Sequence, residues 1–121
     1  MNAAKALVET YYALVDAQDD AMFHLFHDDV VYKRPGYPTL AGRRALQKFY
    51  QRDRVIPSGR HTVHELFVGD QGRVAVEGRF CGVLKNGTEA DLAFSDFFDL
   101  DLTQVPPQII ARRTYLDDAR V

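Results

Sequence analysis

One carboxylate in this sequence stands on what would otherwise be an apolar strand face. Its neighbours of the same parity are Leu92, Phe94, Phe98, Leu100 and Leu102. Alternate residues of a strand share a face, and a carboxylate is costly to bury unless it is paired or hydrogen-bonded. Burial raises a carboxyl pKa towards the range that proton transfer needs. We therefore expect Asp96 to be a general base or acid in an apolar pocket that Leu92 and Phe94 help to line. The alternative is an aspartate paired with an arginine.

Charged residues on two further predicted strands could support that chemistry. Glu77 and Arg79 lie two apart within residues 73–84 and so share a face. They form either a solvated or interface ion pair or an anchor that positions Asp96 or a substrate oxygen. On the predicted strand 108–116, Arg112 and Arg113 have opposite parity, so one of them faces the pocket side. Thr114 shares the parity of Arg112.

Several residues with polar side chains complete the candidate site. Tyr32 and Arg34 share a face, and a phenol with a guanidinium could stabilise a carbonyl or enolate oxygen. They could equally be a core tyrosine and a solvated arginine. His61 could serve as an acid or base because imidazole titrates near neutrality, although a histidine at a strand start is more often a surface residue. Tyr12 and Tyr50 lie on apolar helix stripes, so we expect their hydroxyls at the cavity edge.

The elements that must position these residues are helices first and strands afterwards. Helical periodicity predicts helices over residues 2–18, 21–26 and 42–54, with a short strand at 30–32 between the last two. Strands follow at residues 61–68, 73–84, 89–102 and 108–116, joined by turns such as Lys85-Asn86-Gly87. This order predicts an α+β domain in which helices pack on one face of a strongly curved, mostly antiparallel sheet. A pocket forms where the helices do not reach.

Composition limits the classes of protein that are possible. The chain of 121 residues fits a single domain over residues 1–121. Fifteen Lys and Arg stand against seventeen Asp and Glu, and no basic block is present, so nucleic-acid binding is disfavoured. No apolar stretch approaches a membrane span, and the N-terminus does not resemble a signal peptide, so we expect a cytoplasmic protein. The histidines and the single cysteine show no ligand spacing, so we expect no metal and no cofactor.

Several segments resemble a known family across essentially the whole chain. They are YKRPGYPTLAGRRALQKFY, RVAVEGRFCGVLKNG, FSDFFDLD and RRTYLD, following a helical start. Together they resemble the SnoaL-like group of the nuclear transport factor 2-like superfamily, which also contains ketosteroid isomerase and limonene-epoxide hydrolase. The resemblance implies a cone-shaped α+β barrel with a deep apolar pocket. It also implies a homodimer formed through the outer sheet face, for which Val74, Val76 and Phe80 would be suitable.

The resemblance to the epoxide hydrolases places individual residues. An arginine and an aspartate on their pocket face correspond to Glu77 and Arg79, and a second catalytic aspartate corresponds to Thr114. A tyrosine and an asparagine of that family correspond to Tyr32 and Arg34. These altered residues make epoxide hydrolysis less favoured. The pocket that the resemblance implies combines Glu77, Arg79, Asp96, Arg112 and Thr114.

The resemblance leads to a hypothesis about function. The favoured activity is that of a cofactor-independent polyketide cyclase, isomerase or dehydratase acting on an apolar carbonyl compound, with Asp96 or else Glu77 as the base. The supporting groups are Tyr32, Arg34 and Arg112 for the oxyanion, Glu77 and Arg79 for orientation, His61 as a reserve acid, and Thr114, Phe94, Leu92, Tyr12 and Tyr50 for substrate binding. The alternative is a binding protein of the same fold for an apolar or anionic small molecule.

Overall fold

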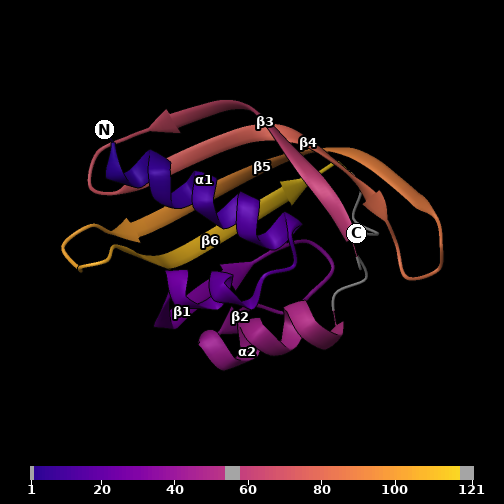
Figure 1. Cartoon of the computed structure of the whole chain (residues 1–121), viewed down its shortest axis with the longest axis horizontal. Helices are drawn as coiled ribbons and strands as arrows, with labels where there is room; N and C mark the ends of the chain where they lie inside the picture. Colours follow the sequence, from indigo (N-terminus) through magenta and orange to yellow (C-terminus); the bar gives the residue numbers. More distant parts are fainter. Residues whose placement is uncertain (1, 54–57, 118–121) are drawn as a thin grey trace.

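The computed structural model describes residues 2–53 and 58–117 (Figure 1). Helical segments occupy most of the first half of the chain and long strands the second half. In chain order the elements are α1 (Ala3–Asp16), a 3₁₀-helix η1 (Asp20–Leu25), β1 (Phe26–Lys33), β2 (Leu40–Ala41), α2 (Arg43–Lys48), a π-helical segment η2 (Phe49–Asp53), β3 (Ser58–Val68), β4 (Arg73–Val83), β5 (Glu89–Asp101) and β6 (Gln108–Leu116). None of the helices described is long and apolar enough to cross a membrane.

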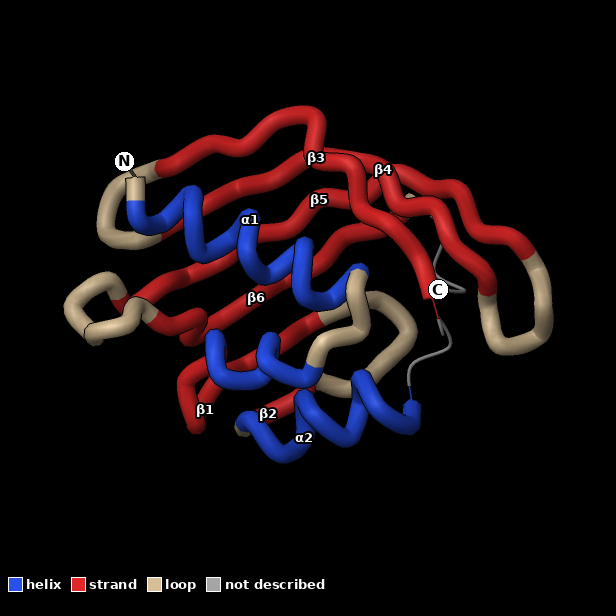
Figure 2. The backbone as a smooth tube through the Cα atoms, viewed as in Figure 1, coloured by secondary structure: helices blue, strands red, loops and turns tan. Residues whose placement is uncertain are grey.

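The strands form one sheet in the order β2-β1-β6-β5-β4-β3. Strands β3 to β6 pair as an antiparallel meander, and β1 joins its edge by pairing in parallel with β6. The sheet curves over α1, which lies across its concave side (Figure 2). The predicted α+β fold class is confirmed, and the sheet brings β5 and β6 side by side beneath the helix.

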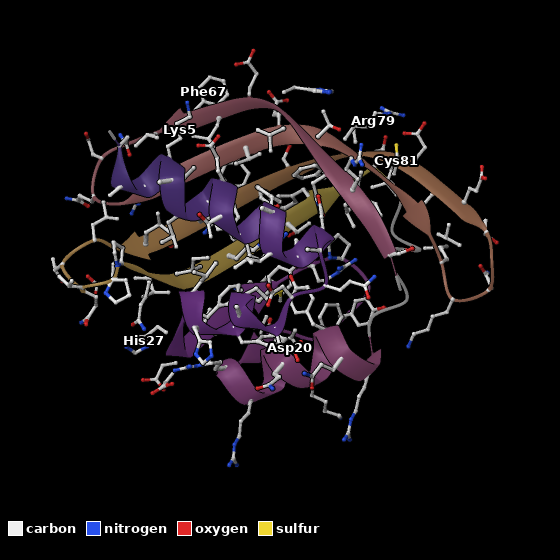
Figure 3. All side chains as sticks on the ribbon, viewed as in Figure 1. Lys5, Asp20, His27, Phe67, Arg79 and Cys81 are labelled. Carbon is white, nitrogen blue, oxygen red and sulfur yellow. The ribbon has the colours of Figure 1, made fainter. Side chains whose placement is uncertain are left out.

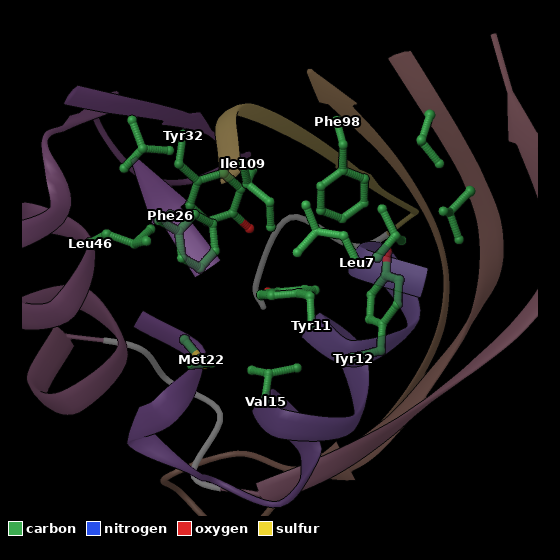
Figure 4. Packing of buried hydrophobic residues seen from close by; sticks show 14 of the residues in the cluster. Leu7, Tyr11, Tyr12, Val15, Met22, Phe26, Tyr32, Leu46, Phe98 and Ile109 are labelled. Carbon is green, nitrogen blue, oxygen red and sulfur yellow. The ribbon is translucent and has the colours of Figure 1, made fainter. Parts of the chain in front are cut away.

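Helix α1 packs on the sheet through an apolar stripe. The Asn2 side chain caps the helix by accepting hydrogen bonds from the backbone N–H groups of Ala4 (2.9 Å) and Lys5 (3.1 Å). The buried residues of the stripe are Ala4, Leu7, Val8, Tyr11, Tyr12 and Val15. Figure 4 shows Tyr11 and Tyr12 extending from α1 into the core, with Phe98 of the sheet nearby. Two adjacent tyrosines are thereby held at the centre of the molecule.

The two faces of β4 correct the parity that the family resemblance implied for this strand. Val74, Val76 and Phe80 are buried on the concave face, so they are not available as a dimer surface. Glu77 and Arg79 are exposed on the opposite face, and Figure 3 shows Arg79 on the outside of the sheet. The face that carries the apolar side chains is the buried one, because moving apolar surface out of water lowers the free energy.

The homodimer expected from the resemblance remains a prediction, but other residues would have to form its interface. The large apolar side chains that are exposed on β3, β5 and β6 include Phe67, Phe97 and Tyr115. Phe67 and Phe97 belong to the face of the sheet that carries Glu77, since both pair in register with Ala75, which has the same parity as Glu77.

Element boundaries differ from expectation mainly around β1 and α2. The strand expected at residues 30–32 extends from Phe26 to Lys33, because it finds a partner in β6. The helix expected over residues 42–54 is α-helical only to Lys48 and continues as a π-helical turn to Asp53. Its expected last residue, Arg54, lies outside the described residues, and Ser58 already belongs to β3.

Candidate active site

Asp96 is the centre of a buried polar cluster. It lies on β5, fully buried, directly opposite Thr114 in the register between β5 and β6. Its Oδ2 accepts a hydrogen bond from Arg112 Nη2 at 2.9 Å and another from the Tyr12 hydroxyl. Its Oδ1 accepts a hydrogen bond from the Thr114 hydroxyl. The inward parity expected for Asp96 is confirmed, and Arg112 rather than Arg113 is the inward arginine.

The electrostatics of Asp96 differ from those expected of a buried base. Burial alone would raise its pKa, but the Arg112 charge and the hydrogen bonds from Arg112, Thr114 and Tyr12 outweigh burial. The pKa of Asp96 is therefore lowered below its ordinary value, and not raised as burial alone would have it. The alternative, an aspartate paired with an arginine, describes the structure: Asp96 is an ionised carboxylate whose oxygens are already hydrogen-bonded.

Three further tyrosines surround this ion pair. Arg112 Nη1 donates to the hydroxyls of Tyr11 (2.5 Å) and Tyr50 (2.7 Å), which are 2.5 Å from each other. The Tyr32 hydroxyl lies 2.9 Å from Thr114 Oγ1. The Arg112 guanidinium also lies 4.7 Å and 4.6 Å from the ring centroids of Tyr11 and Tyr32. Tyr11 was not among the predicted site residues, yet its hydroxyl belongs to the cluster.

The buried tyrosine hydroxyls remain protonated. Burial raises the pKa of Tyr11, Tyr12 and Tyr32 above the ordinary value. The site thus combines one fixed ion pair with neutral phenols.

A cavity opens beside the cluster. Its volume is about 20 Å³, so its interior is narrow. The lining residues are Tyr11, Tyr32, Arg34, Tyr50, His61, Phe80, Phe94, Asp96, Arg112, Thr114 and Leu116. Its lining combines polar groups with apolar side chains. This is the arrangement expected of a small-molecule site.

The predicted site residues divide into three groups. Nine of the twelve occur in the cavity or its polar cluster, Tyr12 among them through its bond to Asp96. Leu92 is buried in the core and does not line the cavity. Glu77 and Arg79 are on the outer face, where Arg79 Nε donates to Asp91 Oδ1 at 2.6 Å. Their assignment to the pocket was wrong, and with it the alternative in which Glu77 is the base instead of Asp96.

His61 lies in the cavity wall, not at the surface. Its Nδ1 is 2.6 Å from Asp16 Oδ1, and its backbone N–H donates to Asp16 Oδ2 at 2.8 Å. The side chain is only 9% exposed. Its ring packs between aromatic rings, with centroids 4.8 to 5.2 Å from those of Phe80, Tyr12 and Phe94. The surface interpretation of His61 was therefore wrong.

The His61–Asp16 pair sets the protonation of the imidazole. Burial lowers the pKa of His61, and the hydrogen bond and charge of Asp16 offset part of that effect. His61 is therefore neutral at pH 7. Since a carboxylate only accepts, Nδ1 carries the proton and Nε2 has the lone pair. Among the described residues, Nε2 has no hydrogen-bond partner.

Asp16, the last residue of α1, was not among the predicted site residues. The sequence did contain a usable signal, because Tyr12 and Asp16 are four residues apart and so lie on the same helix face. Asp16 reaches past the helix end to the start of β3.

Arg34 is positioned by the loop that follows β1. Its guanidinium carbon lies 5.2 Å from the Tyr37 ring centroid and 5.3 Å from that of Phe49. It lines the cavity together with Arg112, as expected from the sequence. Within residues 2–53 and 58–117, no group of three or more His, Cys, Asp and Glu side chains could hold a metal ion.

Comparison with known proteins supports the same fold. A family model for a SnoaL-like domain matches residues 8–103. A proposed polyketide cyclase from Xanthomonas campestris pv. campestris is 28% identical, with a TM-score of 0.76 over 93% of this chain and 89% of that one. No curated protein matches.

Two further solved structures share the fold at lower identity. An NTF2-like protein of unknown function from Burkholderia pseudomallei is 17% identical, with a TM-score of 0.84 over 97% of this chain and 92% of that chain. The epoxide hydrolase/cyclase-like enzyme SalBIII, which has a role in pyran ring formation in the polyether salinomycin, is 21% identical, with a TM-score of 0.80 over 93% and 89% of the two chains.

Proposed function

This chain belongs to the SnoaL-like family, as the sequence resemblance predicted, and from that premise we propose a cofactor-independent acid–base enzyme of the cyclase or isomerase type. Its substrate is a small carbonyl compound with an apolar body. His61 is the proton-transfer group in this proposal, and Asp96 is not. The names of the cyclase and the epoxide hydrolase/cyclase-like neighbour support the type of reaction.

The observation that carries the proposal is the His61–Asp16 dyad in the cavity wall. A general base needs a lone pair, a pKa near the working pH and access to the substrate. His61 is neutral at pH 7, lines the cavity and has its proton held on Nδ1 by Asp16. When Nε2 gains a proton, the Asp16 carboxylate stabilises the imidazolium that forms, as the third group of a catalytic triad does.

The proposed reaction begins with proton abstraction at a carbon next to the carbonyl. The His61 Nε2 lone pair takes the proton, and the electrons of the C–H bond form an enolate whose charge moves to the carbonyl oxygen. Donors in the cavity lining, above all Arg112, stabilise that oxygen. The imidazolium then returns the proton at another carbon, or at an oxygen that leaves, so that His61 ends neutral again.

Asp96 has a positioning role in this account. Its carboxylate already accepts hydrogen bonds from three side chains, and its lowered pKa makes it a weak base. It holds Arg112 in place and balances its charge. A preorganised donor of this kind costs no rearrangement when the oxyanion develops.

Proton exchange tests the proposal without knowledge of the natural substrate. 2-Tetralone and 1-indanone, two flat ketones, are incubated in D2O with the protein, and loss of the α-proton signal is followed by NMR. The wild type should exceed the buffer rate, and His61→Gln should lower the enzymatic rate by about 10² to 10⁴-fold. His64→Gln is the matched control, because His64 is exposed on the same strand. Equal exchange by wild type and His61→Gln would contradict the proposal.

A binding protein without chemistry is the second candidate. Two observations favour it: the cavity is narrow, and the carboxylate of Asp96 is already hydrogen-bonded. A protein that only binds a ligand needs no reacting group in its cavity. The two candidates differ in the fate of a bound ketone. If bound 2-tetralone exchanges its α-protons with D2O no faster than 2-tetralone in buffer alone, the result would favour binding alone.

A further inference from the structure

The cavity is smaller than the ligand that the proposed function requires. Its volume of about 20 Å³ has room for about one water molecule, whereas a cavity that binds benzene measures about 150 Å³. Part of the cavity wall must therefore move when a ketone with a ring binds. We propose that Phe80 moves, and that the flat ring of such a ketone takes the place of its phenyl ring. The inference rests on the proposed function and names a specificity-determining residue of the same site.

Hydrogen bonds hold the polar part of the lining in place. Asp96 accepts hydrogen bonds from Arg112 and Thr114, and Asp16 holds His61 at two atoms. Moving any of these groups would break bonds inside the protein. Among the residues that the structure describes, the lining also includes three hydrocarbon side chains, which no hydrogen bond holds: Phe80, Phe94 and Leu116. A cavity that widens and keeps its polar cluster intact does so by moving one of these three.

The Phe80 ring lies over backbone that carries no side chains. Its neighbours of the same parity on β4 are Gly78 and Gly82, and Gly59 of β3 pairs in register with Gly82. A Cβ at Gly82 would lie 2.8 Å from Cζ of the ring, and a Cβ at Gly59 would meet the same atom. When the ring turns to another staggered rotamer, it leaves a bay that is floored by backbone. Glycine inside a strand often marks a place that a ligand approaches closely.

Phe94 and Leu116 are less suited to this movement. Phe94 stands between Leu92 and Asp96 on the inner face of β5, and its ring centroid is 5.8 Å from that of Tyr12. Leu116 is smaller than a phenyl ring and is half-buried at the end of β6, so its movement frees less interior space. The displacement of Phe80 therefore enlarges the cavity most while it disturbs the fewest neighbouring side chains, and Phe94 stays as a wall against which the ligand packs.

Two ketones, 2-tetralone with its rings and butan-2-one without one, test the inference on the wild-type protein. The ring centroids of Phe80 and Phe94 lie 4.8 Å and 5.2 Å from that of His61, so both pairs should give nuclear Overhauser signals in NMR. We expect 2-tetralone to abolish the Phe80–His61 signal and to keep the Phe94–His61 signal, and butan-2-one to leave both. A Phe80–His61 signal that persists at saturating 2-tetralone would overturn the inference, as would no binding of 2-tetralone at millimolar concentration.

Phe80→Ala and Phe94→Ala form a matched pair, because each removes one phenyl ring from the cavity lining. The inference predicts about tenfold tighter binding of 2-tetralone to Phe80→Ala, since the ligand no longer has to displace a ring. Phe94→Ala should weaken binding, because it removes the wall against which the ligand packs. Equal tightening by the two variants would mean that any added space improves binding, and would overturn the inference. The NMR comparison uses the wild type, so it decides the matter even where a variant fails to fold.

These results are separate from the fate of the proposed function. If 2-tetralone displaces Phe80 but its α-protons exchange no faster than in buffer, the binding position stands and the proposed function fails. If His61 is required for exchange but Phe80 keeps its place, the function stands and this inference fails.

Discussion

Two arginine–aspartate pairs lie on opposite faces of β5. On the outer face Arg79 Nε is 2.6 Å from Asp91 Oδ1, and the two side chains are 47% and 62% exposed. On the inner face Arg112 Nη2 is 2.9 Å from Asp96 Oδ2, and the side chains are 4% and 0% exposed. The outer contact is the shorter one. Distance therefore does not distinguish the pairs, whereas exposure to water does.

The difference in exposure decides what each pair can do. Water and ions screen the outer pair, and both side chains can move away without leaving a buried charge. The inner pair has lost its hydration, so each charge depends on the other and on the surrounding hydroxyls. Only the inner pair can fix the position of a donor for chemistry. The His61–Asp16 pair is intermediate, with side chains 9% and 22% exposed, and this suits a group that must gain and lose a proton.

The largest effect that separates the two faces is expected on stability. Asp96→Asn leaves Arg112 buried without a counter-charge and should lower the free energy of unfolding by about 3–5 kcal/mol. Asp91→Asn on the same strand should change it little, because its partner stays in water. Urea unfolding of both variants measures the difference.

A double variant sharpens this comparison. Asp96→Leu combined with Arg112→Met removes both charges and keeps apolar volume, so it should recover a large part of the stability lost in Asp96→Asn. If Asp96→Asn and Asp91→Asn lowered the free energy of unfolding equally, burial would not determine how much these pairs contribute to stability.

Asp16→Asn is expected to have an effect on catalysis that is smaller than that of His61→Gln. Losing the carboxylate charge removes a contribution that raises the pKa of His61, so this pKa should fall further. The acidic limb of the pH–rate profile for ketone proton exchange should move to lower pH, and the maximum rate should fall. Glu9→Gln, exposed on the same helix, is the control. An unchanged pH profile in Asp16→Asn would separate Asp16 from the action of His61.

These residues also show how far the sequence alone could lead. The strand over residues 108–116 was predicted with its observed bounds, because turn and proline signals delimit it. The inward face of β5 with Asp96 followed from alternation alone. The parity of β4 was misassigned because the family correspondence was preferred to the apolar pattern of Val74, Val76 and Phe80.

The protonation of the site could not be read from the sequence. The pKa of Asp96 depends on its contacts with Arg112, Tyr12 and Thr114. These residues belong to two other elements, α1 and β6, and are distant from Asp96 in the sequence. The His61–Asp16 pair joins the end of α1 to β3, 45 residues apart. No pattern of period two or period 3.6 encodes such a contact. The fold was therefore more accessible than the chemistry.

The smallest expected effect is on the pH dependence of stability. Because the folded pKa of His61 is lowered, the unfolded chain binds its proton more readily, and stability falls as the pH drops below about 6.5. Each unit by which the pKa is lowered corresponds to about 1.4 kcal/mol. Asp96, also lowered, adds a further loss only below about pH 4.

A comparison of wild type and His61→Gln isolates the first of these two contributions. Urea unfolding between pH 7.5 and 5 should show a steeper fall for wild type than for the variant. Parallel stability curves would mean that the pKa of His61 is the same in the folded and unfolded states.

The claim at the centre of this account is that His61, and not Asp96, is the group that exchanges protons in the cavity. One NMR pH titration tests it directly by following the His61 ring nitrogens and the Asp96 carboxyl carbon together, with His61→Gln and Asp96→Asn for assignment. The account predicts a His61 midpoint below about 6.5, a neutral form with its proton on Nδ1, and no titration of Asp96 above about pH 3.9. A carboxyl of Asp96 that titrates near neutrality, or a His61 midpoint above 6.5, would contradict it.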